Sequence, residues 1–328
     1  MLVKSGAAAL ESNSLRLQRK LIMRILIPVD GSSFSTHAVA FVASRADLAQ
    51  SRAAADAPDI ELLNVQYPVS SRVVRAAGSQ LVNDYQTSQA NQVLKPCIAA
   101  LKRAGVVART TFLVGSPGTA VGTAAAAHGA DLIVMGSHGH TGFKSVLFGS
   151  VTNAVLASCS TPVLVLRDSV IPKKASLRLG VALDGGKYGL AAVKFLVKNP
   201  TLFGALPAVT LMHVVPDLMN LTLPGFLGTK PVPSYEPGQV EAMQQAAFEQ
   251  AVAAPKKLLE AAGIKVTAVC LTGNNPGDEI AVYVKKNKLD MLVMGSHGLG
   301  ALKSITMGSV STRVAATSRL PLLLIRKP

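Results

Sequence analysis

The chain has 328 residues, of which 49% are hydrophobic and 16% charged. This composition excludes a globally disordered chain, and no stretch approaches the roughly 18 uninterrupted apolar residues of a membrane-spanning helix. The net charge of +15 looks dispersed along the sequence, apart from short clusters such as Lys173-Lys174, Lys256-Lys257 and Lys285-Lys286-Lys288. Without a dense basic stripe and aromatic residues beside it, this pattern argues against a nucleic-acid partner.

The first 22 residues lack the apolar core of a secretory signal. We expect residues 1–22 to be a flexible extension, or an over-long gene start with Met23 as the true first residue. Three cysteines, Cys97, Cys159 and Cys270, lie far apart and form no metal-binding spacing. They are interpreted as reduced, buried thiols of a cytoplasmic protein.

From Met23 onward, short strands rich in β-branched residues alternate with helices. In the first half the pattern predicts strands at Arg24–Val29, Ile60–Val65, Val106–Val114, Leu132–Met135 and Val163–Leu166. Helices are expected at Phe34–Gln50, up to Lys102 after a polar loop, at Gly118–His128 and at Gly149–Ser158. This order predicts an α/β fold, a doubly wound five-stranded parallel sheet with helices on both faces.

The second half repeats the first. Asp131-Leu-Ile-Val-Met-Gly-Ser-His-Gly139 recurs, with two changes, as Asp290-Met-Leu-Val-Met-Gly-Ser-His-Gly298. Strands follow in the same order at Arg178–Leu183, Ala208–Val215, Lys265–Leu271, Met291–Met294 and Leu322–Ile325. So long a period indicates a duplicated domain rather than a solenoid. We therefore expect two tandem domains, residues 23–169 and 170–328, after the extension.

Glycines cluster where strands end, which is where ligands bind in such sheets. Gly136-x-x-Gly139 is followed by nine residues and then Gly149-Ser150, and Gly295-x-x-Gly298 is followed in the same way by Gly308-Ser309. Glycine lets the backbone approach a ligand, and a helix beginning at Gly149 or Gly308 offers free N–H groups to a phosphate. The alternative is a tight strand–helix connection, with the glycines needed for packing and the serine as a cap. Neither a P-loop nor a G-x-G-x-x-G motif is present.

Both halves resemble the universal stress protein family, whose ATP-binding members carry G-x-x-G, nine residues and G-[ST]. The opening Ile25-Leu-Ile-Pro-Val-Asp-Gly-Ser-Ser33 and the closing Thr161-Pro-Val-Leu-Val-Leu-Arg167 carry the rest of the resemblance. It implies two Rossmann-like domains of the adenine-nucleotide alpha hydrolase type that bind ATP, with Mg²⁺ arriving on the phosphates. It also implies that the two halves pack as a pseudo-dimer, with further dimerisation open.

The resemblance assigns nucleotide contacts in the first half to Pro28, Asp30, Val65, Met135, Gly136, Gly139, Gly149, Ser150 and Val151. Asp30 and the Val65 backbone would meet adenosine, and the helix beginning at Gly149 would hold the phosphates. The matching residues of the second half are Asp184, Val214, Met294, Gly295, Gly298, Gly308, Ser309 and Val310. The alternative for Asp30 and Asp184 is capping of the following turn.

The second half departs from the pattern. Ala182 replaces Pro28, and Gly186-Lys187 replace Ser32-Ser33. The loop over residues 216–238 contains five prolines and could cover the site. We therefore expect the two sites to differ in affinity. His138 is interpreted mainly as a residue that orders its loop.

The leading hypothesis is a cytoplasmic ATP-binding protein that acts as a stress sensor or regulator rather than as a fast enzyme. No G-x-S-x-G elbow or paired carboxylates accompany the glycine loop. A slow ATPase, or a protein that acts through contacts without a nucleotide, remain as alternatives. The protein partner is not predicted.

Overall fold

The computed structural model describes residues 23–50, 58–138, 148–167, 174, 176–204, 207–218, 237–296 and 307–327. These residues form two compact units. Unit 1 ends at Leu166, and unit 2 comprises the described residues from Arg167 onward together with Phe148. The expected extension 1–22 and the site residues Gly139 and Gly298 lie outside the described residues.

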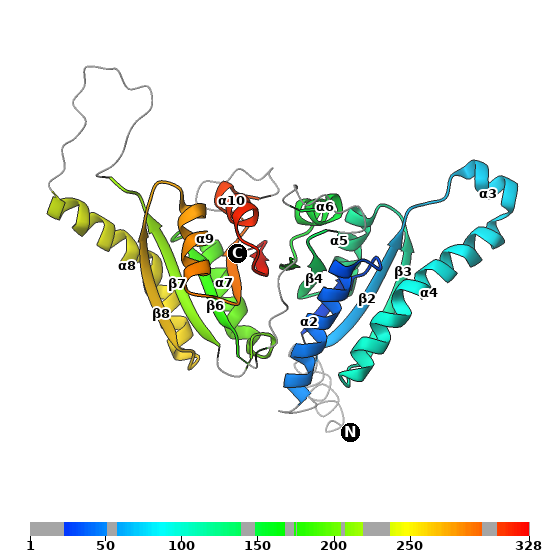
Figure 1. Cartoon of the computed structure of the whole chain (residues 1–328), viewed down its shortest axis with the longest axis horizontal. Coiled ribbons are helices and arrows are strands. Elements are labelled where there is room, and N and C mark those ends of the chain that lie inside the picture. The colour runs from blue at the N-terminus through cyan, green and yellow to red at the C-terminus, as the bar shows by residue number, and fades with distance from the viewer. Residues whose placement is uncertain are drawn as a thin grey trace, which may run out of the picture. The chain divides into compact units, whose positions relative to one another are not determined.

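Unit 1 is a parallel sheet of five strands between two helical layers (Figure 1). The strands are β1 (Arg24–Pro28), β2 (Asp59–Gln66), β3 (Ala108–Val114), β4 (Leu132–Gly136) and β5 (Val163–Leu166), in the spatial order β3-β2-β1-β4-β5. Helices α2 (Ser33–Gln50) and α4 (Ser79–Arg103) pack together on one face, and α5 (Pro117–His128) and α6 (Ser150–Ser158) on the other. Each strand reads as a short apolar run because both faces are covered.

Unit 2 repeats this architecture, as the duplication predicts. Its strands are β6 (Arg178–Leu183), β7 (Ala208–Val215), β8 (Val266–Thr272), β9 (Met291–Gly295) and β10 (Leu322–Ile325), in the order β8-β7-β6-β9-β10. Helix α7 (Lys187–Lys198) packs with α8 (Pro237–Ala261), and α9 (Pro276–Lys286) packs with α10 (Ser309–Thr317). A 3-10 turn, η2 (Pro200–Leu202), follows α7. The predicted doubly wound α/β fold is confirmed.

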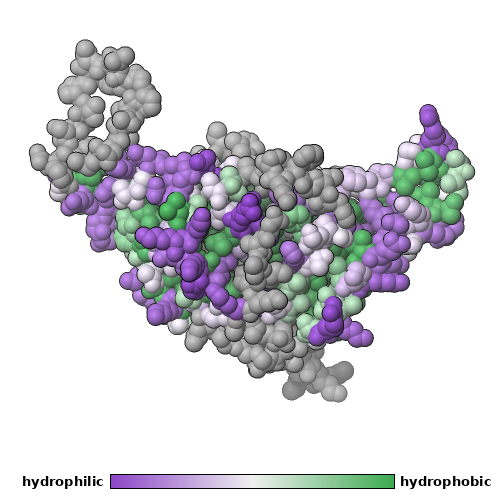
Figure 2. Space-filling model, viewed as in Figure 1, coloured by the Kyte–Doolittle hydropathy of each residue, from purple (hydrophilic) through white to green (hydrophobic). Residues whose placement is uncertain are grey.

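One element was not predicted. The segment after β2, expected as a polar loop, contains the short helix α3 (Ser71–Ala77), which buries none of its residues. Gly78 separates it from α4 with a φ of +87°, a conformation that glycine adopts readily. Helix α3 and the start of α4 project beyond the sheet, where apolar residues are visible at the surface (Figures 1 and 2). Leu81 and Tyr85, in the first turns of α4, are exposed.

The cysteine interpretation needs correction. All three thiols are free, but Cys97 alone is buried, Cys159 is half-buried and Cys270 is exposed. Cys270 differs because β8 is the edge strand of unit 2 and buries none of its residues. Burial, followed by the charge of Asp30, raises the pKa of the Cys97 thiol. Among the described residues, no helix has the length and apolar character needed to cross a bilayer.

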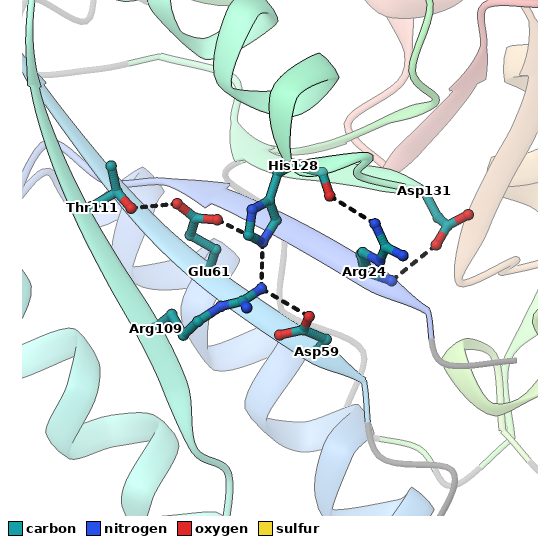
Figure 3. A network of polar contacts seen from close by, with 7 residues as sticks. All are labelled: Arg24, Asp59, Glu61, Arg109, Thr111, His128 and Asp131. Carbon is teal, nitrogen blue, oxygen red and sulfur yellow. Dashed lines mark hydrogen bonds and ion pairs between the residues drawn. The ribbon is translucent and has the colours of Figure 1, made fainter. Parts of the chain in front are cut away.

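A polar network of seven residues lies where the strands of unit 1 begin (Figure 3). At its centre the carboxylate of Glu61 is 6% exposed, accepts a hydrogen bond from the Thr111 hydroxyl and lies 2.6 Å from His128 Nε2. An Arg109 nitrogen lies 2.6 Å from the same His128 Nε2 and 2.8 Å from an Asp59 oxygen. The ring of His128 therefore joins a buried acid to an exposed ion pair.

The rest of the network holds the start of β1. The backbone N–H of Arg24 donates to Asp131 at 3.0 Å, and its guanidinium donates to the His128 carbonyl at 3.0 Å. In unit 2 the N–H of Arg178 donates to Asp290 at 2.9 Å in the same way. The Arg–Asp contact is thus common to both units, whereas the Glu61–His128 contact belongs to unit 1.

We expect His128→Asn to destabilise unit 1 by about 2 to 4 kcal/mol. The variant removes the imidazole that contacts Glu61, so the carboxylate of Glu61 stays buried without that partner. Thr210 and Asn287 occupy the equivalent positions in unit 2. The double variant Glu61→Thr/His128→Asn, which copies that pair, should therefore regain most of the lost stability. Urea unfolding of both variants measures the difference, and equal destabilisation would show that the two side chains are not coupled.

Candidate functional site

The strand order of each sheet reverses at its centre. Chain direction across unit 1 reverses between β1 and β4, which are neighbours at the centre of the sheet. Ligands of doubly wound sheets bind outside the carboxyl ends of the strands at such a reversal. Asp30 follows β1 and Gly136 ends β4, so the structure brings both predicted residues to this edge, and Asp184 and Gly295 to the edge of unit 2.

Each of the two aspartates caps a turn. Asp30 Oδ1 accepts hydrogen bonds from the N–H of Ser32 at 3.0 Å and from its hydroxyl at 2.6 Å. Gly31, at a φ of +86°, makes the turn possible. Asp184 Oδ1 accepts from the N–H of Gly186 at 2.9 Å. The capping role is therefore present in both units, and it fixes a carboxylate at the end of the first strand.

Past the end of β1, the backbone of Val65 has polar groups available. Val29 N donates to Leu63 O at 2.8 Å, which shows that Leu63 turns its backbone groups toward β1. Alternate residues of a strand point the same way, so Val65 also turns its N–H and C=O to that side, where β1 has already ended. Among the described residues these two groups have no hydrogen-bond partner. A donor and an acceptor are thus presented together at the edge.

The side chains beside Val65 were not foreseen. Asn64 is buried and donates from Nδ2 to the Val29 carbonyl at 2.8 Å. This carbonyl is the acceptor to which the Val65 N–H would donate if the strand pairing continued. In unit 2 the equivalent residue is His213, whose Nδ1 lies 2.9 Å from the Leu183 carbonyl. The only signal in the sequence is one polar residue near the end of an apolar strand, which does not say what that residue contacts.

An amide chain ties the same strand end of unit 1 to α4. Gln66 Nε2 donates to Asn64 Oδ1 at 3.3 Å and to the Gln86 carbonyl at 3.1 Å. Gln86 Nε2 in turn donates to the Tyr67 carbonyl at 3.4 Å. Val215 replaces Gln66 in unit 2. Unit 2 keeps the last of these contacts, because Gln244 Nε2 of α8 donates to the Pro216 carbonyl at 2.8 Å, but it lacks the two contacts that Gln66 makes.

Gly136 lies against α2. A Cβ atom at this position would lie 2.5 Å from Phe34 Cβ and 2.8 Å from the Phe34 carbonyl carbon. Such a contact is prohibitive, because backbone atoms cannot swing away as a side chain can. Gly136 therefore has a packing reason independent of any ligand. Met135 and Met294, at 5% and 4% exposure, lie in the core, so only their backbones reach the edge.

Helix α6 is anchored directly to the end of β4. The N–H of Gly149 donates to the Ser137 carbonyl at 2.8 Å, and the Thr152 hydroxyl donates to the Gly136 carbonyl at 3.1 Å. In unit 2, Gly308 N donates to the Ser296 carbonyl at 2.8 Å, and the Ser311 hydroxyl donates to the Gly295 carbonyl at 3.0 Å. Thr152 and Ser311, which sequence reasoning missed, hold the helix start at the sheet edge.

The beginnings of α6 and α10 carry no side-chain cap. Their N-cap residues, Gly149 and Gly308, lack a side chain, and no side-chain hydrogen bond satisfies the first turn of either helix. Ser150 and Ser309 are exposed at the first helical position, and Val151 and Val310 follow half-buried. Free N–H groups and the positive end of the helix dipole favour an anion here.

His138 follows the end of β4 and packs against α2. Its ring packs on Phe34 with centroids 5.5 Å apart, and its Nδ1 lies 3.1 Å from the Ser137 hydroxyl. These contacts hold the His138 ring against α2 and β4, and the loop that it was predicted to order, residues 139–147, lies outside the described residues. Among the described residues, no group of three or more His, Cys, Asp or Glu side chains could hold a metal ion.

Comparison with known proteins gives the same assignment for both units. The model of the universal stress protein family matches residues 22–167 and again 177–326. A universal stress protein of Methanocaldococcus jannaschii is 28% identical over 152 residues, which is 46% of this chain and 82% of that protein. One from Mycobacterium bovis is 24% identical over 200 residues, 60% of this chain and 62% of that protein, so less than two thirds of its length is matched.

A solved structure shows the same two-domain fold over nearly the whole chain. The crystal structure of a universal stress protein from Archaeoglobus fulgidus aligns with a TM-score of 0.65 at 22% identity, covering 93% of this chain and 98% of that one. The family match spans both halves and leaves out little more than the first residues and the connection between units. The chain therefore belongs to the universal stress protein family, with two such domains in tandem.

Proposed function

We propose that unit 1 binds ATP at the carboxyl edge of its sheet, that unit 2 binds it more weakly, and that the protein acts as a nucleotide-dependent regulator. The observation that carries this proposal is the pairing of two features at one edge. The backbone of Val65 presents a donor and an acceptor, and the uncapped start of α6 presents N–H groups. The first suits the edge of an adenine base, and the second suits phosphate oxygens.

The other residues at this edge would complete the site. Asp30, fixed by its own turn, would accept hydrogen bonds from hydroxyl groups of the ribose. Gly149, Ser150 and Val151 would hold the phosphates through the helix start. Mg²⁺ would be held by the phosphates, since the described residues offer no metal-binding cluster. Magnesium prefers to keep several waters and to bind phosphate oxygens with few protein ligands, which fits such a site.

A regulatory role follows from where the nucleotide would sit. It would join the ends of β1 and β2 to the start of α6. Its binding energy would then favour conformations that hold these elements together, and a partner that recognises them would respond to nucleotide. We place this activity in the cytoplasm, where ATP is abundant.

The weaker site in unit 2 rests on three differences. Ala182 stands in place of Pro28, Gly186 replaces Ser32, whose hydroxyl donates to Asp30, and Val215 lacks the amide with which Gln66 donates to Asn64 and α4. Each change leaves the end of a strand less firmly held. A less organised site gives up more conformational freedom on binding, which lowers its affinity.

Titration calorimetry of the intact protein with Mg-ATP tests the proposal. We expect two binding events of unequal affinity, of which the tighter belongs to unit 1. No detectable heat in either would contradict nucleotide binding, and equal affinities would contradict the difference between units. Phosphate release measured on the same samples would separate a regulator, with negligible turnover, from a slow ATPase.

A further inference from the structure

Six basic residues line the opposite edge of unit 2, where its strands begin. We call this set the basic edge: Lys174, Arg178, Lys265, Lys285, Lys286 and Lys288. These residues are far apart in the sequence, so their charge looks dispersed when the sequence is read alone. In a parallel sheet, however, all strands begin at one edge and the helices on its faces end there, so the fold brings these residues together.

The chain contacts confirm this placement. Arg178 opens β6, Lys265 directly precedes β8, and Lys285 and Lys286 end α9. The guanidinium of Arg178 donates hydrogen bonds to the carbonyls of Asn287 and Lys288, the turn that follows α9. Three inter-strand steps separate β8 from β9, and at about 4.8 Å each they give the basic edge a length of about 14 Å.

Most of this charge is not neutralised. Asp290 lies 2.7 Å from Lys174 Nζ and 3.5 Å from Arg178 Nε. Burial acts to raise the pKa of Asp290, but hydrogen bonds from Lys174 and the Arg178 N–H, with their charges, lower it overall. Asp290 is thus an anion at neutral pH and offsets part of that charge. The other four lysines are exposed, and in the described part of the chain none of them forms an ion pair.

The duplicate unit shows that the lysines are not required by the fold. Where unit 2 has Lys285, Lys286 and Lys288, unit 1 has Ala126, Ala127 and Gly129. Both turns close the same type of helix with a residue of positive φ, +61° at Gly129 and +51° at Lys288.

Lys288 is the only residue other than glycine with a positive φ in the described part of the chain. That conformation is unfavourable for a residue with a side chain, and glycine is preferred at this position after a helix. The lysine thus weakens the turn while it adds a charge. Local stability therefore does not explain the residue, whereas an anionic ligand would.

We propose that the basic edge of unit 2 binds the phosphate backbone of double-stranded nucleic acid, without reading its sequence. Duplex DNA carries one negative charge per about 1.7 Å of its axis with both strands counted, so a length of about 14 Å contains about eight phosphates, of which those on one side face the protein. Lysines act as point charges toward phosphate and do not supply the planar fork with which arginine reads bases. Among the described residues of unit 2 no aromatic side chain is exposed, so unpaired bases have no ring to stack on, which favours a duplex over a single strand.

A lipid surface fits this edge less well. Val282, one turn before Lys285, is the one large apolar side chain exposed on α9, which provides too little apolar area to insert between lipids. Hydrophilic residues cover the visible side of this helix (Figure 2). The ligand recognised here is therefore a regular row of phosphates rather than an apolar layer with anionic headgroups.

The test removes the three lysines that unit 1 lacks. The variant Lys285→Ala/Lys286→Ala/Lys288→Gly copies the residues of unit 1, and the matched control Lys95→Ala/Lys102→Ala/Arg103→Ala removes equal charge from α4. Fluorescence anisotropy with a short labelled DNA duplex would be measured from about 50 to about 200 mM KCl. We expect the first variant to lose on the order of 100-fold in affinity and two to three units of salt slope, and the control to lose about twofold at most.

Two further measurements make the result decisive. The melting temperature of Lys288→Gly alone should rise by about 2 °C, so that stability and duplex affinity change in opposite directions. Mg-ATP titration should be unchanged in every variant, which separates this proposal from that for the nucleotide site. Equal loss of duplex affinity in the control, no duplex binding by the intact protein, or tighter binding to phosphatidylserine vesicles than to duplex would overturn the proposal.

Discussion

Replacing Ser150 by glutamate is expected to lower the ATP affinity of unit 1 by about 100-fold while the fold keeps its stability. Ser150 is exposed at the first position of α6, and no acidic residue lies in that turn. A carboxylate there interacts favourably with the helix dipole, by about 0.3 to 1 kcal/mol. It would also stand within a few ångströms of the bound phosphates, where repulsion between like charges amounts to about 3 kcal/mol.

The opposite signs of the two effects make this variant informative. If α6 holds the phosphates, calorimetry shows weaker ATP binding at an unchanged or higher melting temperature. Adenosine, which has no phosphate, should bind Ser150→Glu as it binds the natural protein. The matching variant Ser309→Glu should abolish only the weaker event, which assigns the two events to the two units. Unchanged ATP affinity in Ser150→Glu would show that the phosphates do not lie at α6.

The second large effect is expected for Gly136→Val, which should destabilise unit 1 by about 3 kcal/mol or more. The new Cβ would lie 2.5 Å from Phe34 Cβ and 2.8 Å from its carbonyl carbon, so α2 must move away from β4. Gly115→Ala is the matched control, because the nearest atom to its added Cβ is Ala120 Cβ at 4.0 Å. Thermal unfolding should show a large loss in the first variant and almost none in the second.

The packing of Gly136 changes how glycine variants are interpreted. A loss of ATP binding in Gly136→Val would follow from unfolding even if no nucleotide ever met that glycine. If Gly136→Val were as stable as Gly115→Ala, the close approach of α2 to β4 would be wrong. Evidence for the nucleotide site must therefore come from exposed positions such as Ser150, where the fold tolerates a change.

Much of the fold could be predicted because it depends on local patterns. Short apolar runs between turn residues place every strand within two residues of its observed ends. Four strands match their predicted bounds: Val163–Leu166, Arg178–Leu183, Ala208–Val215 and Leu322–Ile325. The repeat predicts that both halves share one fold. Helix α3 was missed because it buries no residue and so leaves no apolar periodicity in the sequence.

The candidate site was predicted less completely. The glycine spacing and the turn at Asp30 identify the strand ends that form the candidate site. Glycine and aspartate can be recognised in a sequence as residues of turns and close backbone approaches, because their side chains favour those conformations. The hydrogen-bond partners of Asn64 and Thr152 lie in segments that are distant in the sequence, so no local sequence pattern predicts these contacts. The reason for Gly136 also required the structure, since a glycine needed for packing and one needed for a ligand look the same in a sequence.

The sequence alone determined the class of fold, the duplication and the family, because these follow from hydrophobic patterning and from motifs that are contiguous in the chain. The tertiary structure decided which residues become neighbours. In unit 2 it brings lysines from positions 174 to 288 together at the edge where the strands begin. In unit 1 it places the unpaired backbone groups of Val65 and the start of α6 at the edge where the strands end. The physical reason is that a parallel sheet aligns all its strand starts at one edge and all its strand ends at the other.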